Sequence, residues 1–417
     1  MSAEIQILDL HEPKLTVAQE RHLRHAEEHP VDLSVAAVLA AAEERTGLDE
    51  FGPRDFEERL ALILAGLDED DNASALSRYT LFHRLVRLAS TRLRALRLLA
   101  EHPEIHARKI ERPIIVAGLP RSGTTHLLNL MAADSRLEAL DYWRSLEPVP
   151  DPREQPGPDG LDPRYARAAQ GWKNLREINP TQVYFHPMDP DHIHEDLELQ
   201  MPDFCTYTWE FAYKAPRWRD YHLAHDQRPH YEFGKTMLKL LDFQSGNERR
   251  WVIKCPQHYE QIPVLLDVYP DATIVFTHRD PVASLQSVAI LLGYRTRVWE
   301  RRPDPTWHFE YWADRIETLL RGYLRDAALV PPERRFDVLF GEFMADDVGM
   351  VERIFDRAGL GATDASRAEL AAYMESHQRG AHGRVVFDMQ RDFGVDPAAM
   401  RERFSFYTEA LEVGVER

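Results

Sequence analysis

The sequence predicts an α/β fold: a parallel sheet flanked by helices, with a helical N-terminal extension and a mainly helical C-terminal part. Three short apolar runs carry this prediction, namely IIVAG at 114–118, WVIK at 251–254 and ATIVFTH at 272–278. Continuous apolar runs of this length are typical of strands that are buried on both faces of a parallel sheet. Helical patterns precede, separate and follow them, which is the order of elements that an α/β domain requires.

The first 110 residues carry helical periodicity. A run from Ser34 to Gly47 begins with a capping residue and ends with a helix-stopping glycine. Apolar residues at the 3.6-residue period follow, at Phe56, Leu60, Ile63, Leu64 and Leu67. A third helix is expected over 81–100, with leucines on one side and several arginines elsewhere, which we expect to form a solvated face.

Composition limits the classes of function. The 417 residues are 44% hydrophobic and 29% charged, with a net charge of −18. This charge argues against nucleic acid as a partner, because a nucleic-acid backbone repels an acidic surface. Two cysteines, no basic start followed by an apolar run, and no long apolar stretch predict a cytoplasmic protein without an integral membrane segment. Any anionic ligand would need a local pocket of cations and backbone N–H groups.

The turn GLPRSGTT at 118–125 is the strongest candidate for such a pocket. It lies between the first predicted strand and a predicted helix, so successive backbone N–H groups and the helix dipole converge on one point, where an anion binds. The hydroxyls of Ser122, Thr124 and Thr125 can donate as well. The sheet is therefore predicted to be of the P-loop type.

The turn departs from the nucleoside-triphosphate loop GxxxxGK[ST]. The spacing of the two glycines is kept, but Thr124 stands at the lysine position and the positive charge has moved to Arg121. A kinase needs that lysine together with a Mg²⁺ clamp, and no carboxylate motif for a metal accompanies the turn, so no metal ligands are predicted. A sulfuryl group carries less charge than a phosphoryl group, which suits a site built from cationic side chains alone.

Taken together, GLPRSGTT, KCPQH at 254–258 and HRDPVASLQS at 278–287 resemble the sulfotransferase family that uses 3′-phosphoadenosine 5′-phosphosulfate (PAPS), most closely its bacterial branch with an extended helical N-terminus. The resemblance divides the chain into an N-terminal extension, 1–110, packed on a P-loop-like catalytic domain, 111–417. It implies that the 5′-phosphosulfate is bound by Arg121, Ser122, Gly123, Thr124 and Thr125.

The resemblance also implies a site for the 3′-phosphate of the donor. Arg279 follows the strand ATIVFTH, and Ser287 stands eight residues later, with Ser284 as a neighbouring alternative. An arginine at the carboxyl end of a strand with a serine on the next helix suits a phosphate independently of the family. Arg279 could instead form a surface ion pair with Asp280.

Lys254 resembles the family lysine that stabilises the leaving group, and His258 is the first candidate for the general base. His258 follows Lys254 by four residues, whereas animal members place their histidine two residues after the equivalent lysine. Carboxylates stay open as alternatives, since some branches use one. The candidates are Glu195, Asp196, Glu198 and Asp141.

Two C-terminal segments show looser similarity. RGAHGRVV, from 379, resembles the loop that closes over the 3′-phosphate, with Arg379, Gly380 and Arg384 as contacts. FGEFMADD resembles a segment beside the adenine, with Phe340 where tyrosine is usual. Phe340 could equally be a core residue.

The expected reaction is in-line transfer of a sulfuryl group from PAPS to a hydroxyl of a small-molecule or lipid-like acceptor, with Arg121 and Lys254 stabilising charge and adenosine 3′,5′-bisphosphate (PAP) as product. Two rivals remain at this stage: a metal-dependent P-loop kinase or nucleotidase, and a non-catalytic nucleotide-binding protein. Homo-oligomerisation is open. A group of aromatic residues predicts a roomy acceptor pocket: Tyr207, Trp209, Phe211, Tyr213, Trp218 and Tyr221.

Overall fold

The computed structural model describes residues 4–246, 249–377 and 383–416. Its central sheet has five strands, all parallel, in the order β3-β4-β2-β5-β6. The strands are β3 (Leu137–Glu138), β4 (Arg250–Lys254), β2 (Ile114–Gly118), β5 (Thr273–His278) and β6 (Arg335–Leu339). The three predicted strands are the three central ones, which confirms the α/β prediction, whereas β3 and β6 were not predicted.

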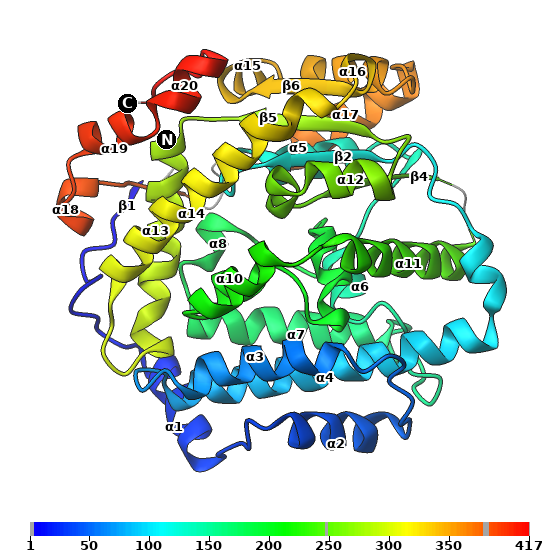
Figure 1. The fold of residues 1–417 in the computed structure, drawn as a ribbon, viewed down its shortest axis with the longest axis vertical. Helices are drawn as coiled ribbons and strands as arrows, with labels where there is room; N and C mark the ends of the chain where they lie inside the picture. Colours follow the sequence, from blue (N-terminus) through cyan, green and yellow to red (C-terminus); the bar gives the residue numbers. More distant parts are fainter. Residues whose placement is uncertain (1–3, 247–248, 378–382, 417) are drawn as a thin grey trace.

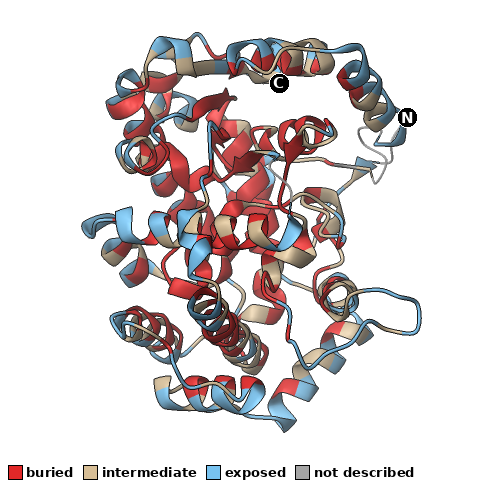
Figure 2. Ribbon diagram, turned by 90° about the vertical axis from the view of Figure 1, so that its right-hand side faces the viewer, coloured by how far each residue is buried: buried red, intermediate tan, exposed pale blue. Residues whose placement is uncertain are grey.

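Both faces of the sheet are buried, and alternate residues of each strand serve opposite faces. Ile114 and Val116 of β2 pack toward α5 (Thr124–Ala132), α16 (Asp347–Arg357) and α17 (Asp364–Ser376). Ile115 and Ala117 pack on the other side, toward the helices α11 (Arg228–Ser245), α12 (Ile262–Val268), α13 (Pro281–Trp299) and α14 (Pro305–Asp326). Figure 2 shows the buried residues concentrated in this central region.

The N-terminal helices form a separate layer at the bottom of Figure 1, drawn in blue. They are α1 (Val17–Glu28), α2 (Val35–Thr46), α3 (Phe56–Asp68) and α4 (Ala75–Glu101). The predicted ends of α2 are confirmed, because the Ser34 side chain accepts from the Ala37 N–H and Gly47 has φ 70°. The apolar side chains of α2, α3 and α4 share one core with residues 201–218, whereas Ala26 of α1 packs with Leu76, Ile178 and Val298.

The arginines of α4 correct one expectation. Arg92 and Arg94 are 3% and 6% exposed, so they do not form a solvated face. Arg94 donates to Asp151 at 2.8 Å, and Arg92 donates to Asp203 at 2.9 Å. Arg59 of α3 also binds Asp203, at 3.0 Å. These buried ion pairs join the N-terminal helices to the rest of the chain, and periodicity alone could not reveal them because their partners lie more than 50 residues away.

The middle of the chain is made of helices and loops, as expected. Its helices are α6 (Tyr142–Leu146), α7 (Pro163–Ile178), α8 (Gln182–Phe185), α9 (Thr208–Ala212) and α10 (Pro216–Ala224), with 3₁₀ turns η1 (Pro103–Ala107), η2 (Asp196–Leu199), η3 (Met201–Asp203) and η4 (Pro256–Glu260). The long helix α11 was not predicted, although Tyr231, Met237, Leu238 and Leu241 do follow a helical period on its buried side.

The C-terminal part is mainly helical, as predicted. It contains α15 (Phe340–Ala345), α18 (Met389–Phe393), α19 (Pro397–Arg403) and α20 (Ser405–Leu411), with 3₁₀ turns η5 (Ala327–Leu329) and η6 (Pro332–Arg334). A short parallel pair joins β1 (Glu4–Ile5) to β7 (Arg384–Val385), so the two ends of the chain lie near each other in Figure 1.

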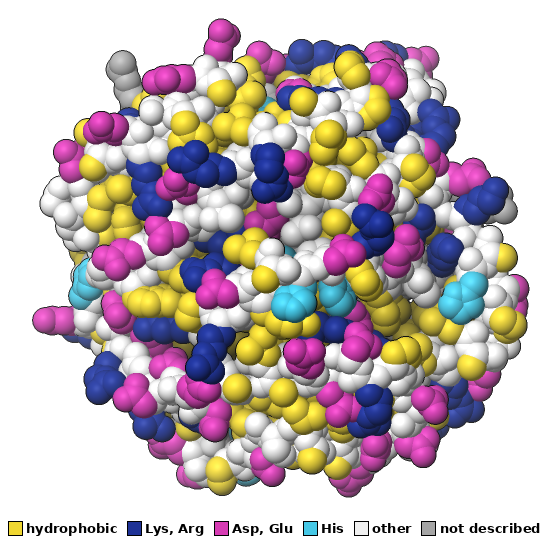
Figure 3. Space-filling view, viewed as in Figure 1, with side chains coloured by type: hydrophobic (Ala, Val, Ile, Leu, Met, Phe, Trp, Pro, Cys, Tyr) yellow, Lys and Arg dark blue, Asp and Glu magenta, His cyan; other side chains and the backbone are white. Residues whose placement is uncertain are grey.

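The surface is mixed in charge. On the face shown in Figure 3, basic and acidic side chains alternate, so the negative excess is not gathered there in one patch. No helix within the described ranges combines the length and the apolar character that crossing a bilayer demands.

The ion pairs at Asp203 generate a stability prediction. Asp203→Asn removes the negative charge that Arg59 and Arg92 share, leaving the buried Arg92 without a carboxylate partner among the described residues and Arg59 with only the exposed Asp55. Because breaking a buried ion pair costs about 3 to 5 kcal/mol, we expect a loss of roughly that size in the free energy of unfolding, measured by urea titration. The matched control is Asp68→Asn. The Asp68 side chain, which pairs with Arg78, is 69% exposed, so this substitution should lower the free energy of unfolding by less than about 1 kcal/mol. Equal losses in the two variants would contradict this account.

Candidate active site

The turn between β2 and α5 has the backbone geometry that an anion site needs. Arg121 and Gly123 both have positive φ, 68° and 85°. Gly123 caps α5 without a side-chain hydrogen bond, and the Leu127 N–H is the donor that reaches its carbonyl. The N–H groups of the first turn of α5 therefore point out of the helix end, where an anion can accept from them.

Close packing fixes this turn against the sheet. A Cβ atom on Gly118 would stand 2.0 Å from Thr277 Oγ1 of β5, so glycine is required there. Ser122 donates to the Leu119 carbonyl at 2.7 Å and its Oγ lies 2.8 Å from Thr277 Oγ1. Ser122 and Thr124 are 1% and 3% exposed. The Ser122 hydroxyl thus holds the turn in place, while Thr125 is half-buried at the rim of the turn.

Arg121 turns its side chain toward α13. Its Nε donates to Ser287 Oγ at 3.0 Å, and its guanidinium also donates to the Phe185 carbonyl and lies 5.8 Å from the Phe185 ring. Burial, together with the positive charge of Arg279, lowers the pKa of Arg121 to about 10. The side chain therefore stays charged at neutral pH. The structure thus brings Arg121 and Ser287, which were assigned to opposite ends of the donor, into direct contact.

Arg279 stands at the end of β5, directly behind the turn. One guanidinium nitrogen donates to the Arg121 carbonyl. The other two form a bidentate pair with the Glu416 carboxylate, at 2.6 and 2.7 Å. The Arg279 guanidinium also lies 4.2 Å from the ring centroid of Phe340. Asp280 does not pair with Arg279; it caps α13 through Val282 N–H.

Phe340 packs against the turn itself. A Cβ atom on Gly123 would stand 3.0 Å from the Phe340 ring, so this aromatic side chain touches both the glycine of the turn and Arg279. On α13, Ser287 is 4% exposed, and the buried Ser284 hydroxyl has no hydrogen-bond partner among the described residues.

Lys254 ends β4 on the other side of the turn. Its side chain is 1% exposed, and its ammonium group contacts the Glu195 carboxylate and donates to Thr125 Oγ1 at 3.3 Å. The Glu195 side chain is 16% exposed, so the ion pair reaches the rim of the site. A buried ammonium needs such a counter-charge. Lys254 and Glu195 therefore form one unit beside the anion-binding turn.

His258 lies deeper in the protein. The ring is fully buried, with Nδ1 2.9 Å from the Tyr231 hydroxyl and Nε2 3.3 Å from Asp196 Oδ1. The other carboxylate candidates are also paired away from Lys254: Asp141 accepts from Arg144 at 2.7 Å, and Glu198 accepts from Arg84 at 3.3 Å. The arginine that follows Trp143 is thus the partner of Asp141.

Two predicted contacts, Arg379 and Gly380, lie outside the described residues, and so does the side chain of Arg384. The sequence missed Glu416 and Phe185, because nothing in the local sequence relates either residue to an arginine 137 or 64 positions away.

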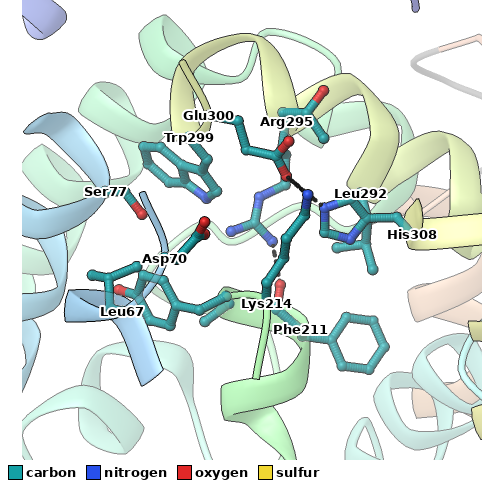
Figure 4. Close-up of a pocket in the computed structure, with 13 residues that line it drawn as sticks. Leu67, Asp70, Ser77, Phe211, Lys214, Leu292, Arg295, Trp299, Glu300 and His308 are labelled. Atoms are coloured by element: carbon teal, nitrogen blue, oxygen red, sulfur yellow. Dashed lines mark hydrogen bonds and ion pairs between the residues drawn. The ribbon is translucent and has the colours of Figure 1, made fainter. Parts of the chain in front are cut away.

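The aromatic segment 207–221 borders two adjoining cavities. The larger one, of about 280 Å³, is lined by Leu62, Ile63, Trp209, Tyr213, Trp218 and Trp307 among others. The smaller one, of about 20 Å³, is lined by both apolar and charged side chains: Figure 4 shows Lys214 reaching Glu300, 3.2 Å away, beside His308. Tyr207 is a core residue, 2% exposed. The predicted aromatic pocket is therefore formed by only part of the segment.

A comparison with protein families decides the identity of the chain. The sulfotransferase family model matches residues 113–364, which is more than half of the chain. The chain belongs to the sulfotransferase family. This sulfotransferase uses PAPS as sulfuryl donor and forms PAP, and a kinase or nucleotidase activity is not favoured.

Individual relatives agree with this assignment. Over 287 residues, 64% of this chain and 67% of the relative, the sulfotransferase is 24% identical to the omega-hydroxy-beta-dihydromenaquinone-9 sulfotransferase Stf3 of Mycobacterium tuberculosis. Its fold is that of the sulfotransferase STF9 from Mycobacterium avium, with a TM-score of 0.81, 24% identity and coverage of 92% and 98% of the two chains. The fold is also similar to that of the sulfotransferase STF1 from M. tuberculosis H37Rv, with a TM-score of 0.77 and 25% identity. That match covers 89% of this chain and 98% of STF1.

The donor set of the sulfotransferase fits PAPS. The Glu416 carboxylate shows that Arg279 can hold a planar anion with two parallel hydrogen bonds, which is also how arginine binds phosphate. The exposed N–H groups of the turn, with Arg121 and Lys254 on either side, supply donors for a second anionic group. The unpartnered Ser284 hydroxyl is a further donor beside Ser287.

The Arg279–Glu416 pair predicts opposite effects of two substitutions on PAP affinity. Arg279→Ala should weaken PAP binding, because charge-assisted hydrogen bonds are lost. Glu416→Gln should tighten PAP binding about two- to fivefold, because PAP no longer has to displace a carboxylate from Arg279. The effect is small because the two side chains, Arg279 and Glu416, are 20% and 35% exposed. Isothermal titration of PAP measures both. Glu412→Gln, an exposed glutamate of the same tail, serves as control and should leave the dissociation constant unchanged. Tighter binding after Arg279→Ala would contradict the assignment.

The histidines near the site predict how stability depends on pH. Burial, with the positive charges of His194 and Lys254, lowers the pKa of His192 to about 3. Below about pH 6.5 the unfolded chain therefore binds a proton that the folded chain does not bind. The stability gained by keeping His192 neutral in the folded protein is complete above about pH 6.5. As the pH falls from about 6.5 toward 3, the free energy of unfolding decreases by up to about 1.4 kcal/mol per pH unit. In His192→Gln, urea unfolding between pH 6 and 4.5 should show a shallower pH dependence, whereas the exposed His225→Gln should match the wild type. Parallel slopes in all three proteins would refute the prediction.

Proposed function

We propose that the donor lies across the carboxyl ends of β2, β4 and β5. Arg279 and Ser287 would bind its 3′-phosphate, and Arg121, Gly123, Thr124 and Thr125, through the turn, its 5′-phosphosulfate. Arg279 touches the turn through the Arg121 carbonyl, and Ser287 touches it through the Arg121 side chain. This continuous set of contacts supports a single site that grips both ends of the nucleotide. Ser122 would act by holding the turn against Thr277.

The contact of Lys254 with Glu195 carries the mechanistic proposal. When bound, PAPS supplies the sulfuryl group and leaves as PAP. Glu195 would take the proton of the attacking hydroxyl as the new oxygen–sulfur bond forms. Lys254 and Arg121 would stabilise the negative charge that develops as the bond from sulfur to the bridging oxygen breaks. Of the candidate bases, Glu195 is the residue whose partner is Lys254 itself, whereas His258 is engaged by Tyr231 and Asp196.

The acceptor is proposed to be a small molecule that carries its hydroxyl on an apolar skeleton. The relative Stf3 is named for an omega-hydroxylated menaquinone. The larger cavity offers apolar and aromatic lining. It is also connected to the site through Arg84. The Arg84 guanidinium lies 5.3 Å from the ring of Trp209, which lines the cavity, and it binds Glu198 in the turn η2, just after Glu195. An apolar part of the acceptor would lie on this side.

Other features remain proposals of the same kind. Arg379 and Gly380 would close over the 3′-phosphate, and residues 1–110 would act as an extension that supports the catalytic domain. A reducing, cytoplasmic location suits the two buried free cysteines, Cys205 and Cys255.

Replacing the two rival bases tests the mechanism. Glu195→Gln should lower kcat about 10²- to 10⁴-fold, because a positioned base contributes that much, while the dissociation constant of PAP changes by less than about threefold. His258→Gln should lower kcat far less, provided that its melting temperature shows a folded protein. The measurement is transfer of radiolabelled sulfate from PAPS to a panel of phenols and alcohols, together with PAP titration.

The reverse order of effects would assign the base to His258. Equal, large losses in both variants at unchanged PAP affinity would point to a base shared between Glu195 and the buried pair His258–Asp196, and the proposal would then be wrong as stated.

A further inference from the structure

A loop beside the site is attached at both ends to the two cations proposed to act on the sulfuryl group. It runs from Phe185 to Glu195. Its first residue accepts a hydrogen bond from the Arg121 guanidinium, and its last residue pairs with Lys254. Any side chain that this loop directs inward therefore lies near the point of transfer.

The middle of the loop is held just as firmly. The Asn129 side chain of α5 donates to the Ile193 carbonyl and accepts from the Ile193 N–H, both at 3.2 Å. The Tyr142 N–H donates to the His192 carbonyl at 2.8 Å. The loop is thus anchored to the same helix whose N-terminus forms the anion site, which fixes the side chains between its ends.

Three histidines of this loop form a cluster, which we call the histidine cluster: His186, His192 and His194. The ring centroid of His186 lies 5.3 Å from that of His192 and 5.5 Å from that of His194. Within the described part of the chain, no group of three His, Cys, Asp or Glu residues is arranged to hold a metal ion.

One ring nitrogen of each histidine is buried without a hydrogen-bond partner among the described residues: Nε2 of His186, Nε2 of His192 and Nδ1 of His194. A buried polar atom without a partner costs about 1 to 3 kcal/mol, and three in one cluster are unusual in a native protein. His186 and His192 as whole residues are only half-buried, so both lie close to the protein surface.

In the ring of His186, the contact made by the other nitrogen indicates whether the unpartnered nitrogen carries a proton or a lone pair. His186 Nδ1 lies 3.2 Å from the Pro187 carbonyl, which can only accept, so Nδ1 carries the proton and Nε2 presents a lone pair. His194 Nε2 lies 3.9 Å from the Glu198 carboxylate. Burial and the neighbouring His192, His194, Lys254 and Arg121 hold the pKa of His186 well below its ordinary value, so this ring is neutral at pH 7.

We propose that His186 accepts, through Nε2, a hydrogen bond from a second hydroxyl of the acceptor, one that is not itself sulfated, so that the enzyme selects neutral molecules with at least two hydroxyl groups. This inference rests on the proposed function, because Glu195 deprotonates the reacting hydroxyl. The lone pair of a neutral imidazole binds an O–H donor well, and it repels carboxylates, sulfates and phosphates, which present only lone pairs. A site built to bind a substrate hydroxyl discriminates strongly against an analogue that lacks it.

The test compares acceptors that differ by one hydroxyl. Transfer of labelled sulfate from PAPS is measured with 2-naphthol and with its 3-, 6- and 7-hydroxy derivatives. Each kcat/KM is divided by the number of hydroxyl groups of the acceptor that can be sulfated. For the wild type, the resulting value for at least one dihydroxy acceptor should exceed that for 2-naphthol by tenfold or more. In His186→Phe this preference should fall to about twofold, while kcat/KM for 2-naphthol changes little. His186→Gln, whose amide oxygen can accept in place of Nε2, should restore part of the preference.

The control is His225→Phe, the same substitution at an exposed histidine stacked on Tyr221, which should keep the full preference. The proposal is overturned if no dihydroxy acceptor is preferred, if the wild type sulfates none of the naphthols, or if His186→Phe keeps the preference. Each of these results with intact PAP binding leaves the proposed donor site standing, whereas loss of PAP binding in the wild type would remove the donor site itself.

Discussion

The burial of Lys254 at the carboxyl end of β4 is the constraint on which the rest of the site depends. A side chain that is 1% exposed keeps its charge only with a counter-ion, and Glu195 provides one. The neighbouring arginines are also held by internal partners: Arg121 donates to the Phe185 carbonyl and to Ser287 Oγ, and Arg279 pairs with the Glu416 carboxylate. An acidic protein can thus concentrate three cations at one edge of a sheet. In the proposed site, donor binding would exchange these internal partners for anionic groups.

The frame around the site explains why these cations meet. Parallel pairing of β2 with β4 and β5 brings the residues that follow each strand to a common edge. The loop that supplies Glu195 and the histidine cluster is held by α5 and continues into η2 and η3, where Asp203 joins it to the N-terminal helices. One continuous segment thus connects the Glu195–Lys254 pair with the ion pairs that hold the N-terminal layer.

The sequence was sufficient for features that depend on local physics. Continuous apolar runs predicted β2, β4 and β5, and the glycines of the turn between β2 and α5 proved to be required by Thr277 and Phe340. That this turn binds an anion stays a prediction. Features that depend on distant partners were missed. The buried arginines of α4 were expected in solvent because Asp203 is about 110 residues away. Glu195 could not be separated from its acidic neighbours, because its distinction is a contact with Lys254, 59 residues on.

The proposed function requires that one pocket binds both ends of the nucleotide, the 3′-phosphate and the 5′-phosphosulfate. The most direct measurement is the ratio of the dissociation constants of adenosine 5′-phosphate and PAP for the wild-type protein, by isothermal titration. Loss of the bidentate arginine contact at the 3′-phosphate is expected to weaken binding by at least about 30-fold, equivalent to roughly 2 kcal/mol. Equal dissociation constants for the two nucleotides would contradict it.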